Sequence, residues 1–272
     1  MSSYLRLHFT GISAEQSEIL IAELSESGFE GFEEGINELK AYIPGDNWNE
    51  AVLTEIAGRV GVSWSKELME ETNWNQVWES NFQPVTVDEY VSIRAHFHEP
   101  VKGVTHEIII TPKMSFGTGH HATTFMMIQM MESISMEGKS LLDFGTGTGV
   151  LAILASKSGA SPVIAIDNDD WSIANARENI LQNNCASVIL KKGNTARLNL
   201  VFDIILANIN KNVILDNFAS LVKQLAPSGV LVLSGLLTTD EAEILGRAQE
   251  QGLTLNQRLA KDNWLALKLS RK

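Results

Sequence analysis

The chain has 272 residues, of which 44% are apolar, and a formal net charge of −12. This length fits one large or two modest domains with a buried core, and the composition excludes disordered and low-complexity classes. No apolar run approaches the roughly 20 residues of a membrane helix, and the N-terminus lacks the pattern of a secretory signal. A single cysteine, Cys185, excludes an internal disulfide framework. We therefore expect a cytoplasmic protein.

The acidic excess lies at one end of the chain. Residues 1–80 hold 15 acidic and 4 basic side chains, whereas residues 81–272 hold 18 and 17. Such a charge serves solubility, or it attracts a basic partner and speeds their encounter. The same field opposes a phosphate backbone, so we expect no direct sequence-specific binding of nucleic acid.

The first part of the chain alternates between strand and helix patterns. Ser13 and Gln16 form the signature of a capping box at the start of a helix, and Gly28 follows that helix. The predicted elements are a strand over 4–9, this helix, a hairpin over 29–43, a helix over 49–60 and a strand over 64–69. Their order, β-α-β-β-α-β, is the ferredoxin-like pattern, so residues 1–70 are predicted to form a small α+β domain, and a module of this kind more often binds than catalyses.

Residues 71–82 carry aromatic side chains at helical spacing. Trp74, Trp78 and Phe82 recur at i, i+4 and i+8, which predicts a helical linker. We expect the tryptophans to pack against one or both domains, with a partner contact as the alternative.

Residues 83–272 are predicted to form a second domain. After a short strand region over 85–110, strands and helices alternate, which predicts a Rossmann-like, doubly wound and mostly parallel sheet. A four-residue connection in the tail, residues 260–263, is too short for a helical crossover and indicates a C-terminal antiparallel hairpin. The predicted strands span 140–144, 162–166, 188–191, 202–207, 230–233 and 253–256, and the predicted helices span 150–157, 171–183, 212–225 and 239–251.

The clearest chemical motif follows the first strand of this domain. Asp143 precedes three alternating glycines, Gly145, Gly147 and Gly149, and a helix begins directly after them. A glycine-rich turn at the carboxyl edge of such a sheet lets a ligand approach the backbone. Asp167 ends the second strand, where its carboxylate can accept hydrogen bonds from two ribose hydroxyls. Together these features predict a nucleotide-like cofactor, and a turn without a ligand is the structural alternative.

Two further segments carry polar groups toward the same edge. Residues 116–124, F-G-T-G-H-H-A-T-T, join a glycine-rich loop to a helix beginning near His120. Phe116, Thr123 and Thr124 are candidate cofactor contacts, and a simple helix cap is the alternative. Asn208 ends the fourth strand and could accept a hydrogen bond from a substrate amine, the alternative being an ordinary Asn turn.

A metal site has little support in the sequence. His96 and His98 share one face of a strand and His106 follows, but no third and fourth ligand pattern accompanies them. We therefore expect no metal. Cys185 and the methionines over 126–136 are interpreted as packed core residues.

The glycine spacing distinguishes between cofactors. A dinucleotide fingerprint needs G-x-G-x-x-G, and counted from Gly145 its third glycine would be residue 150, which is Val150. The spacing in this chain is instead G-x-G-x-G. The pattern, led by Asp143, resembles motif I of the methyltransferases that use S-adenosyl-L-methionine (AdoMet). A nicotinamide oxidoreductase remains the alternative.

The combined motifs resemble those of a specific family. F-G-T-G-H-H-A-T-T, D-F-G-T-G-T-G, I-D and A-N-I, together with N-W-N-Q-V-W in the linker, are similar to the bacterial ribosomal protein L11 methyltransferases (the PrmA family). The resemblance implies AdoMet-dependent methylation of lysine side chains and the N-terminal amine of a basic large-subunit ribosomal protein. It implies as well that the ferredoxin-like domain, residues 1–70, recognises and holds this substrate. It also implies that Thr124, Gly145, Asp167 and Asn208 bind the cofactor. Ala122, where many members have proline, and residues 113–115 depart from the family pattern.

The resemblance leads to a mechanistic hypothesis. The methyl group passes in line to a neutral amine, positioned by Asn208 as the catalytic residue, without a dedicated base. We expect a monomer. The alternatives are an AdoMet-dependent methyltransferase acting on RNA or a small molecule, and a cofactor-binding assembly factor without turnover.

Overall fold

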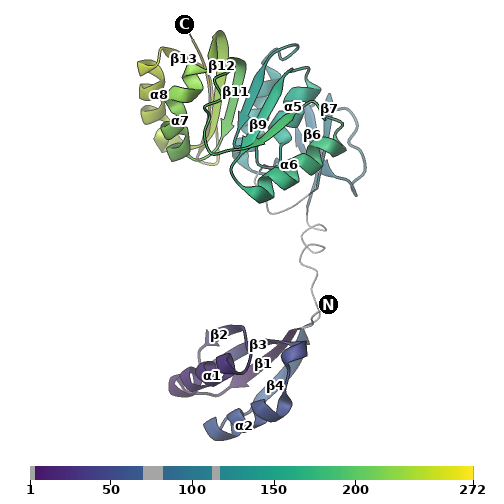
Figure 1. The fold of residues 1–272 in the computed structure, drawn as a ribbon, viewed down its shortest axis with the longest axis vertical. Coiled ribbons are helices and arrows are strands. Elements are labelled where there is room, and N and C mark those ends of the chain that lie inside the picture. Colours follow the sequence, from purple (N-terminus) through teal and green to yellow (C-terminus); the bar gives the residue numbers. More distant parts are fainter. Residues whose placement is uncertain (1–3, 70–81, 112–116, 272) are drawn as a thin grey trace. The chain divides into compact units, whose positions relative to one another are not determined.

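The structure is a computed structural model that describes residues 4–69, 82–111 and 117–271. The chain divides into two compact units, Met1–Asn81 and Phe82–Lys272 (Figure 1). The predicted linker tryptophans, Trp74 and Trp78, lie outside the described residues. In the part of the chain that is described, no helix is long and apolar enough to cross a membrane.

The smaller unit has the predicted β-α-β-β-α-β order, with two helices covering one face of a four-stranded antiparallel sheet (Figure 1). The sheet order is β2-β3-β1-β4, so the first strand is central. Alternate residues of that strand, Leu7 and Phe9, are fully buried against Leu20 and Leu24 of the first helix. The elements are β1 (Tyr4–Thr10), α1 (Ala14–Glu26), β2 (Gly31–Gly35), β3 (Glu38–Pro44), η1 (Gly45–Asn47), α2 (Glu50–Val60) and β4 (Trp64–Met69).

Both helices of this unit begin at a side chain that caps the backbone. Ser13 accepts a hydrogen bond from the Gln16 N–H while the Gln16 side chain accepts from the Ser13 N–H, so the predicted capping box is confirmed. Asn49 caps the second helix in a similar way, and Gly61 ends it with a left-handed φ of 75°. Each cap satisfies backbone donors that a helix end leaves unpaired.

The larger unit is built on a seven-stranded sheet. Five parallel strands come first, and the last two strands form an antiparallel hairpin, as predicted. The turn of the hairpin consists of Asp262 and Asn263, both with positive φ, which suits a tight two-residue connection. In spatial order the strands are β10 (Ile189–Lys192), β9 (Val163–Asp167), β8 (Leu141–Phe144), β11 (Phe202–Asn208), β12 (Leu225–Leu237), β14 (Trp264–Arg271) and β13 (Leu253–Lys261).

Helices cover both faces of this sheet, which makes it doubly wound (Figure 1). One face packs against α4, α5 and α6, and the other against α7 and α8. The methionines of α4 and Cys185 are buried on the first face, as the sequence predicted. The helices are α4 (Ala122–Glu132), α5 (Val150–Lys157), α6 (Asp170–Gln182), α7 (Lys211–Lys223) and α8 (Glu241–Glu250), the last preceded by η2 (Thr238–Asp240).

A separate three-stranded sheet precedes the main one: β5 (Val85–Val87), β6 (Val91–Ala95) and β7 (His106–Ile110). One edge of β7 and the residue after it are bound by side-chain amides of α6 instead of another strand. Asn183 bonds both the N–H and the C=O of Ile109, and Asn179 accepts from the N–H of Thr111 at 2.8 Å. Asn175 donates to the C=O of Thr111. These three buried residues, at i, i+4 and i+8 of one helix face, form the asparagine ladder.

Asn179 also reaches the glycine-rich turn, because its amide nitrogen donates to the C=O of Thr148 at 2.8 Å. Replacing Asn179 by Leu leaves the partly buried N–H of Thr111 and the buried C=O of Thr148 without this partner, and an unpaired buried group costs about 1–3 kcal/mol. We expect a loss of at least 5 °C in the melting temperature of the larger unit, measured by calorimetry. Gln182→Leu is the matched control, since its exposed amide also bonds Thr111, and it should change the melting temperature by less than about 2 °C. Equal effects of the two substitutions would refute the role given to the ladder.

Candidate functional site

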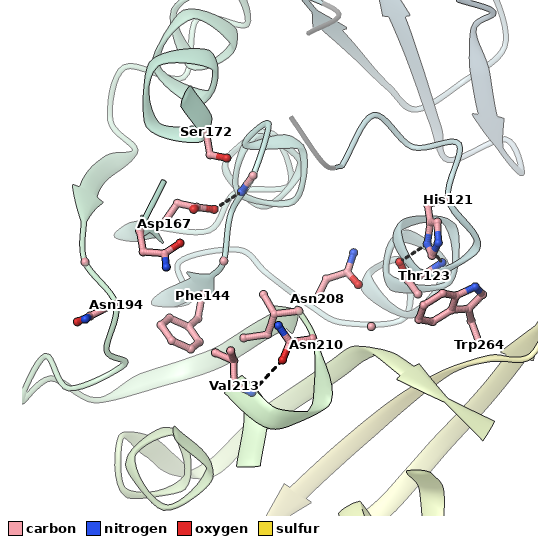
Figure 2. Close-up of a pocket in the computed structure, with 16 residues that line it drawn as sticks. His121, Thr123, Phe144, Asp167, Ser172, Asn194, Asn208, Asn210, Val213 and Trp264 are labelled. Carbon is pink, nitrogen blue, oxygen red and sulfur yellow. Dashed lines mark hydrogen bonds between the residues drawn. The ribbon is translucent and has the colours of Figure 1, made fainter. Parts of the chain in front are cut away.

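A cavity of about 480 Å³ opens where the order of the parallel strands reverses, between the carboxyl ends of β8 and β11. Such a switch point is where open α/β sheets bind ligands. Asp167 and Asn194 lie at one end of the cavity, and Asn208 lies near its middle (Figure 2). His121 and Trp264 lie at the other end. The lining residues are His121, Thr123, Phe144, Gly145, Gly147, Asp167, Asn168, Ser172, Gly193, Asn194, Asn208, Ile209, Asn210, Val213, Gly235 and Trp264.

The glycine-rich turn lines this cavity with backbone. Gly145 donates its N–H to the carbonyl of Ile166 at 2.8 Å, which ties the turn to the end of β9. Gly147 donates its N–H to Oδ2 of Asp167 at 2.8 Å, and Asp169 donates to Oδ1 at 3.1 Å. These two hydrogen bonds hold the Asp167 carboxylate in place, and Asp167 lines the cavity (Figure 2).

Ile209 explains why two of the lining residues are glycines. A Cβ on Gly145 would lie 2.1 Å from Cγ2 of Ile209, and a Cβ on Gly235 would lie 2.2 Å from its carbonyl oxygen. Both glycines also have φ near 80°, a region that side chains disfavour. The backbones of β8 and β12 thus approach the residue after Asn208 closely and fix the end of β11.

Asn208 places an unsatisfied oxygen in the cavity wall. Its amide nitrogen donates to the hydroxyl of Thr124 at 3.2 Å, while its Oδ1 is buried without a hydrogen-bond partner. A buried acceptor left unpaired costs about 1–3 kcal/mol unless a ligand donor meets it. Asn208 is therefore the lining residue best suited to accept a hydrogen bond from an N–H or O–H group of a ligand.

The start of α4 supplies the polar groups of residues 121–124. His121 caps the helix with Nδ1, which accepts from the N–H of Thr123 at 3.3 Å and lies 2.8 Å from its hydroxyl. Thr123 lines the cavity, whereas Thr124 lies behind the wall and holds Asn208. Phe116 lies outside the described residues.

Asp143 and Gly149 lie beneath the cavity and do not line it. Asp143 is fully buried, accepts a hydrogen bond from the Thr146 hydroxyl at 2.5 Å, and has an unpartnered Oδ1. Burial raises the pKa of this carboxyl to about 7. Gly149 is the N-cap of α5, where a Cβ would lie 3.3 Å from Cβ of Ala176 on the neighbouring helix. Both residues support the turn in this structure.

Sequence reasoning did not single out several lining residues. Asn194 follows β10, and the rule that ligands lie at the carboxyl ends of parallel strands could have indicated it. Trp264 and Gly235 come from β14 and β12, and their contribution depends on pairing across the C-terminal hairpin.

The histidines considered as metal ligands have other partners. His98 accepts from the N–H of Ala95 through Nδ1, and His106 lies 3.3 Å from the hydroxyl of Ser158. Burial, and then the charge of Lys157, lower the pKa of His106. Across residues 4–69, 82–111 and 117–271, no three side chains of the metal-binding types converge.

Comparison with known proteins identifies the family. The family model described as ribosomal protein L11 methyltransferase (PrmA) matches residues 8–272. The chain belongs to this family. It is therefore a methyltransferase, as the resemblance implied, and methyltransferases of the family use AdoMet.

Relatives named ribosomal protein L11 methyltransferase align with almost all of this chain. A ribosomal protein L11 methyltransferase of Porphyromonas gingivalis is 40% identical over 93% of this chain and 90% of its own length. One from Bacteroides thetaiotaomicron is 36% identical over 97% of both chains. The solved ribosomal protein L11 methylase of Lactobacillus delbrueckii subsp. bulgaricus has a TM-score of 0.66 at 28% identity, covering 70% of this chain and all of that chain.

A methyltransferase of Pyrococcus furiosus resembles this one in fold alone. It has a TM-score of 0.51 at 19% identity and covers 60% of this chain. Together with the sheet topology, this likeness confirms the predicted Rossmann-like methyltransferase fold.

The raised pKa of Asp143 predicts a pH dependence of stability. A carboxyl that binds its proton more tightly in the folded state stabilises that state at low pH, and this contribution is lost as the pH rises from about 4 to about 7. Between pH 5.5 and pH 8 the wild type should lose about 2 kcal/mol of unfolding free energy that Asp143→Asn does not lose. Urea unfolding at both pH values measures the difference. Asp203→Asn is the control, because a backbone hydrogen bond from Ser140 lowers the pKa of Asp203 and its titration lies below this window. Parallel pH profiles of wild type and Asp143→Asn would contradict the assignment.

Proposed function

We propose that this methyltransferase transfers methyl groups from AdoMet to amines of ribosomal protein L11, in the cytoplasm. Its membership in the family and the names of its relatives support the substrate. The observation that carries the chemistry is the unpartnered Oδ1 of Asn208 in the wall of the cavity. An amine N–H is the donor that this oxygen lacks.

The residues present fit AdoMet. The cavity has the size of a small-molecule site, and two glycines of the turn, Gly145 and Gly147, line it. Asp167 is the residue for the two ribose hydroxyls, and Gly145 and Gly147 offer backbone. Asn208 lies near the middle of the cavity and Thr123 beside His121 (Figure 2). Phe116 stays a proposed contact, while Asp143, Gly149 and Thr124 act by holding the residues that line the cavity. When bound, AdoMet supplies an electrophilic methyl group on a positively charged sulfur.

The chain's own contribution is the positioning of the amine. Oδ1 of Asn208 accepts one N–H and so directs the nitrogen lone pair, while Thr124 fixes the amide that carries this oxygen. The one carboxylate among the described residues that line the cavity, Asp167, is held by two backbone N–H groups at the far end (Figure 2). His121 lines the other end of the cavity, where its Nδ1 caps α4 by accepting from the N–H of Thr123. We assign no side-chain base, and the lysine proton leaves to water. Orientation of this kind contributes roughly 7–11 kcal/mol to catalysis.

The acidic smaller unit is suited to hold a basic protein. Residues 4–69 contain four basic side chains, and each is ion-paired with a glutamate: Arg6 with Glu67, Lys40 with Glu33, Arg59 with Glu23, and Lys66 with Glu50. The remaining carboxylates leave a net negative field, which favours encounter with a basic ribosomal protein. We assign substrate capture to residues 1–70 on this ground.

Mass spectrometry tests the proposed substrate. Large-subunit proteins from cells that lack the enzyme are incubated with the pure protein and AdoMet, and intact masses are followed over time. We expect L11 alone to gain mass in methyl steps, and peptide mapping then identifies the amines. Modified RNA or a modified small molecule with unchanged L11, in the same reaction, would replace the substrate assignment by the alternative.

Substitutions at Asn208 and Thr124 test the positioning role. Asn208→Ala should lower kcat on L11 about 10- to 100-fold. This loss of rate corresponds to about 1.5–3 kcal/mol, the free energy of a buried hydrogen bond that is lost from the transition state. Thr124→Val keeps the amide but releases it, so we expect a smaller loss of kcat, about three- to tenfold, at unchanged KM for L11. Steady-state kinetics by mass spectrometry measure both. Near-normal kcat of Asn208→Ala would remove Asn208 from the mechanism.

A further inference from the structure

Two aromatic rings form the end of the cavity opposite Asp167 and Asn194. The rings of His121 and Trp264 meet edge to face, with centroids 4.7 Å apart and planes at 69°. Both side chains line the cavity beside Thr123 (Figure 2). We refer to His121 and Trp264 as the aromatic wall.

The aromatic wall is held by regular structure. Trp264 is the first residue of β14, directly after the tight turn of the hairpin, and is paired with Leu237 of β12. The N–H of Thr238 donates to the carbonyl of Asn263 at 2.9 Å, which closes this corner. His121 is fixed as the N-cap of α4. A wall built on strand and helix ends keeps its geometry better than one built on a long loop.

Among the described residues, no carboxylate lines the cavity at the aromatic wall, so a cation there would be held by aromatic rings and not by an ion pair. Asp167 is the one carboxylate among the described lining residues, and it lies at the other end (Figure 2). The carboxylates of Asp240 and Glu243, close in sequence to Thr238, are engaged by Lys211 at 3.1 and 3.0 Å. A positive group at this end would therefore meet the rings of His121 and Trp264.

Methylation of an amine changes what a binding site must offer. In each round the neutral nitrogen gains an N–C bond as the methyl–sulfur bond breaks, and the ammonium product releases a proton to water before the next round. The nitrogen thus loses one N–H donor per round, and a fully methylated product is a permanent cation without donors. Hydrogen-bond acceptors serve the first round best, whereas aromatic faces attract quaternary ammonium groups without any N–H.

We propose that the aromatic wall is the subsite for the acceptor amine, and that Trp264 determines how many methyl groups the amine receives. This inference rests on the proposed N-methylation. Asn208 holds the amine while it has N–H donors, and Trp264 stabilises the positive charge that develops on the dimethylated nitrogen, which has no N–H, as it takes the last methyl group. The role of Trp264 is thus specificity for the later rounds.

Substitutions of Trp264 test the inference on L11. Trp264→Leu should lower the rate of the last methyl addition about tenfold relative to the first, so that lower methylation states accumulate. Trp264→Phe keeps a ring and should stay within about threefold of the wild type. Intact-mass time courses give the ratio of the methylation states, and melting temperatures verify that each variant is folded. Trp171→Leu is the control, since Trp171 is 78% exposed and does not line the cavity.

A binding measurement separates this inference from the substrate assignment. Titration of the full chain, saturated with S-adenosylhomocysteine, with N-acetyl-trimethyllysine amide should show about tenfold weaker binding to Trp264→Leu than to the wild type or Trp171→Leu. The affinity for S-adenosylhomocysteine itself should be the same in all three. An unchanged ratio of methylation states, unchanged binding of the trimethylated probe, or loss of S-adenosylhomocysteine binding in Trp264→Leu would each overturn the inference. Failure of the wild type to methylate L11 would instead overturn the proposed function, because the titration needs no L11.

Discussion

A single buried amide joins the parts of the larger unit that make the site. Asn179 accepts from Thr111 after the last strand of the small sheet and donates to Thr148 in the glycine-rich turn. Neither backbone group has a strand partner at that point, so the amide substitutes for a strand. Buried backbone groups must be paired, and here the pairing comes from one face of α6. This amide fixes the Thr148 side of the turn, while Gly145 and Gly147 are held by Ile166 and Asp167.

The glycine-rich turn in turn fixes the segments that surround the cavity. Thr148 donates its hydroxyl to the carbonyl of Gly117 at 2.7 Å, which ties the turn to the loop before α4. On the other side, Gly145 and Gly235 approach Ile209 closely and set the end of β11. Asn208 is consequently held by backbone contacts on one side and by Thr124 on the other. An unpaired oxygen can be kept in such a wall because its surroundings leave it no other orientation.

The parts of the fold that could be predicted are those that depend on local sequence patterns. The helix after the glycines begins at Val150 and ends at Lys157 as predicted, since the glycine spacing and the apolar run fix both ends. The ferredoxin-like order and the C-terminal hairpin also follow from periodicity and turn residues. β12, by contrast, begins at Leu225 and not at Val230, because its pairing with β11 extends beyond the apolar segment.

The candidate site was less predictable, for two physical reasons. A motif groups residues without showing which of them face the ligand. Asp143 and Gly149 were predicted as cofactor contacts from the motif, and neither is among the residues that line the cavity. Trp264 has the opposite character: its sequence context is that of an ordinary strand, and only pairing with Leu237 brings it to the cavity. The asparagine ladder was hidden in the same way, because three amides on one helix face look like a solvated surface until β7 is placed beside them.

The two ends of the cavity have different structural origins. Asp167, Gly145 and Gly147 come from the parallel strands that the chain shares in fold with methyltransferases as distant as that of Pyrococcus furiosus. The aromatic wall comes from the N-terminus of α4 and from the antiparallel hairpin, outside that βα alternation. A common sheet edge can therefore serve a common cofactor while the additions to it select the acceptor. In the proposed mechanism the hairpin brings Trp264 to the acceptor amine, and its pairing with Leu237 sets the position of this ring.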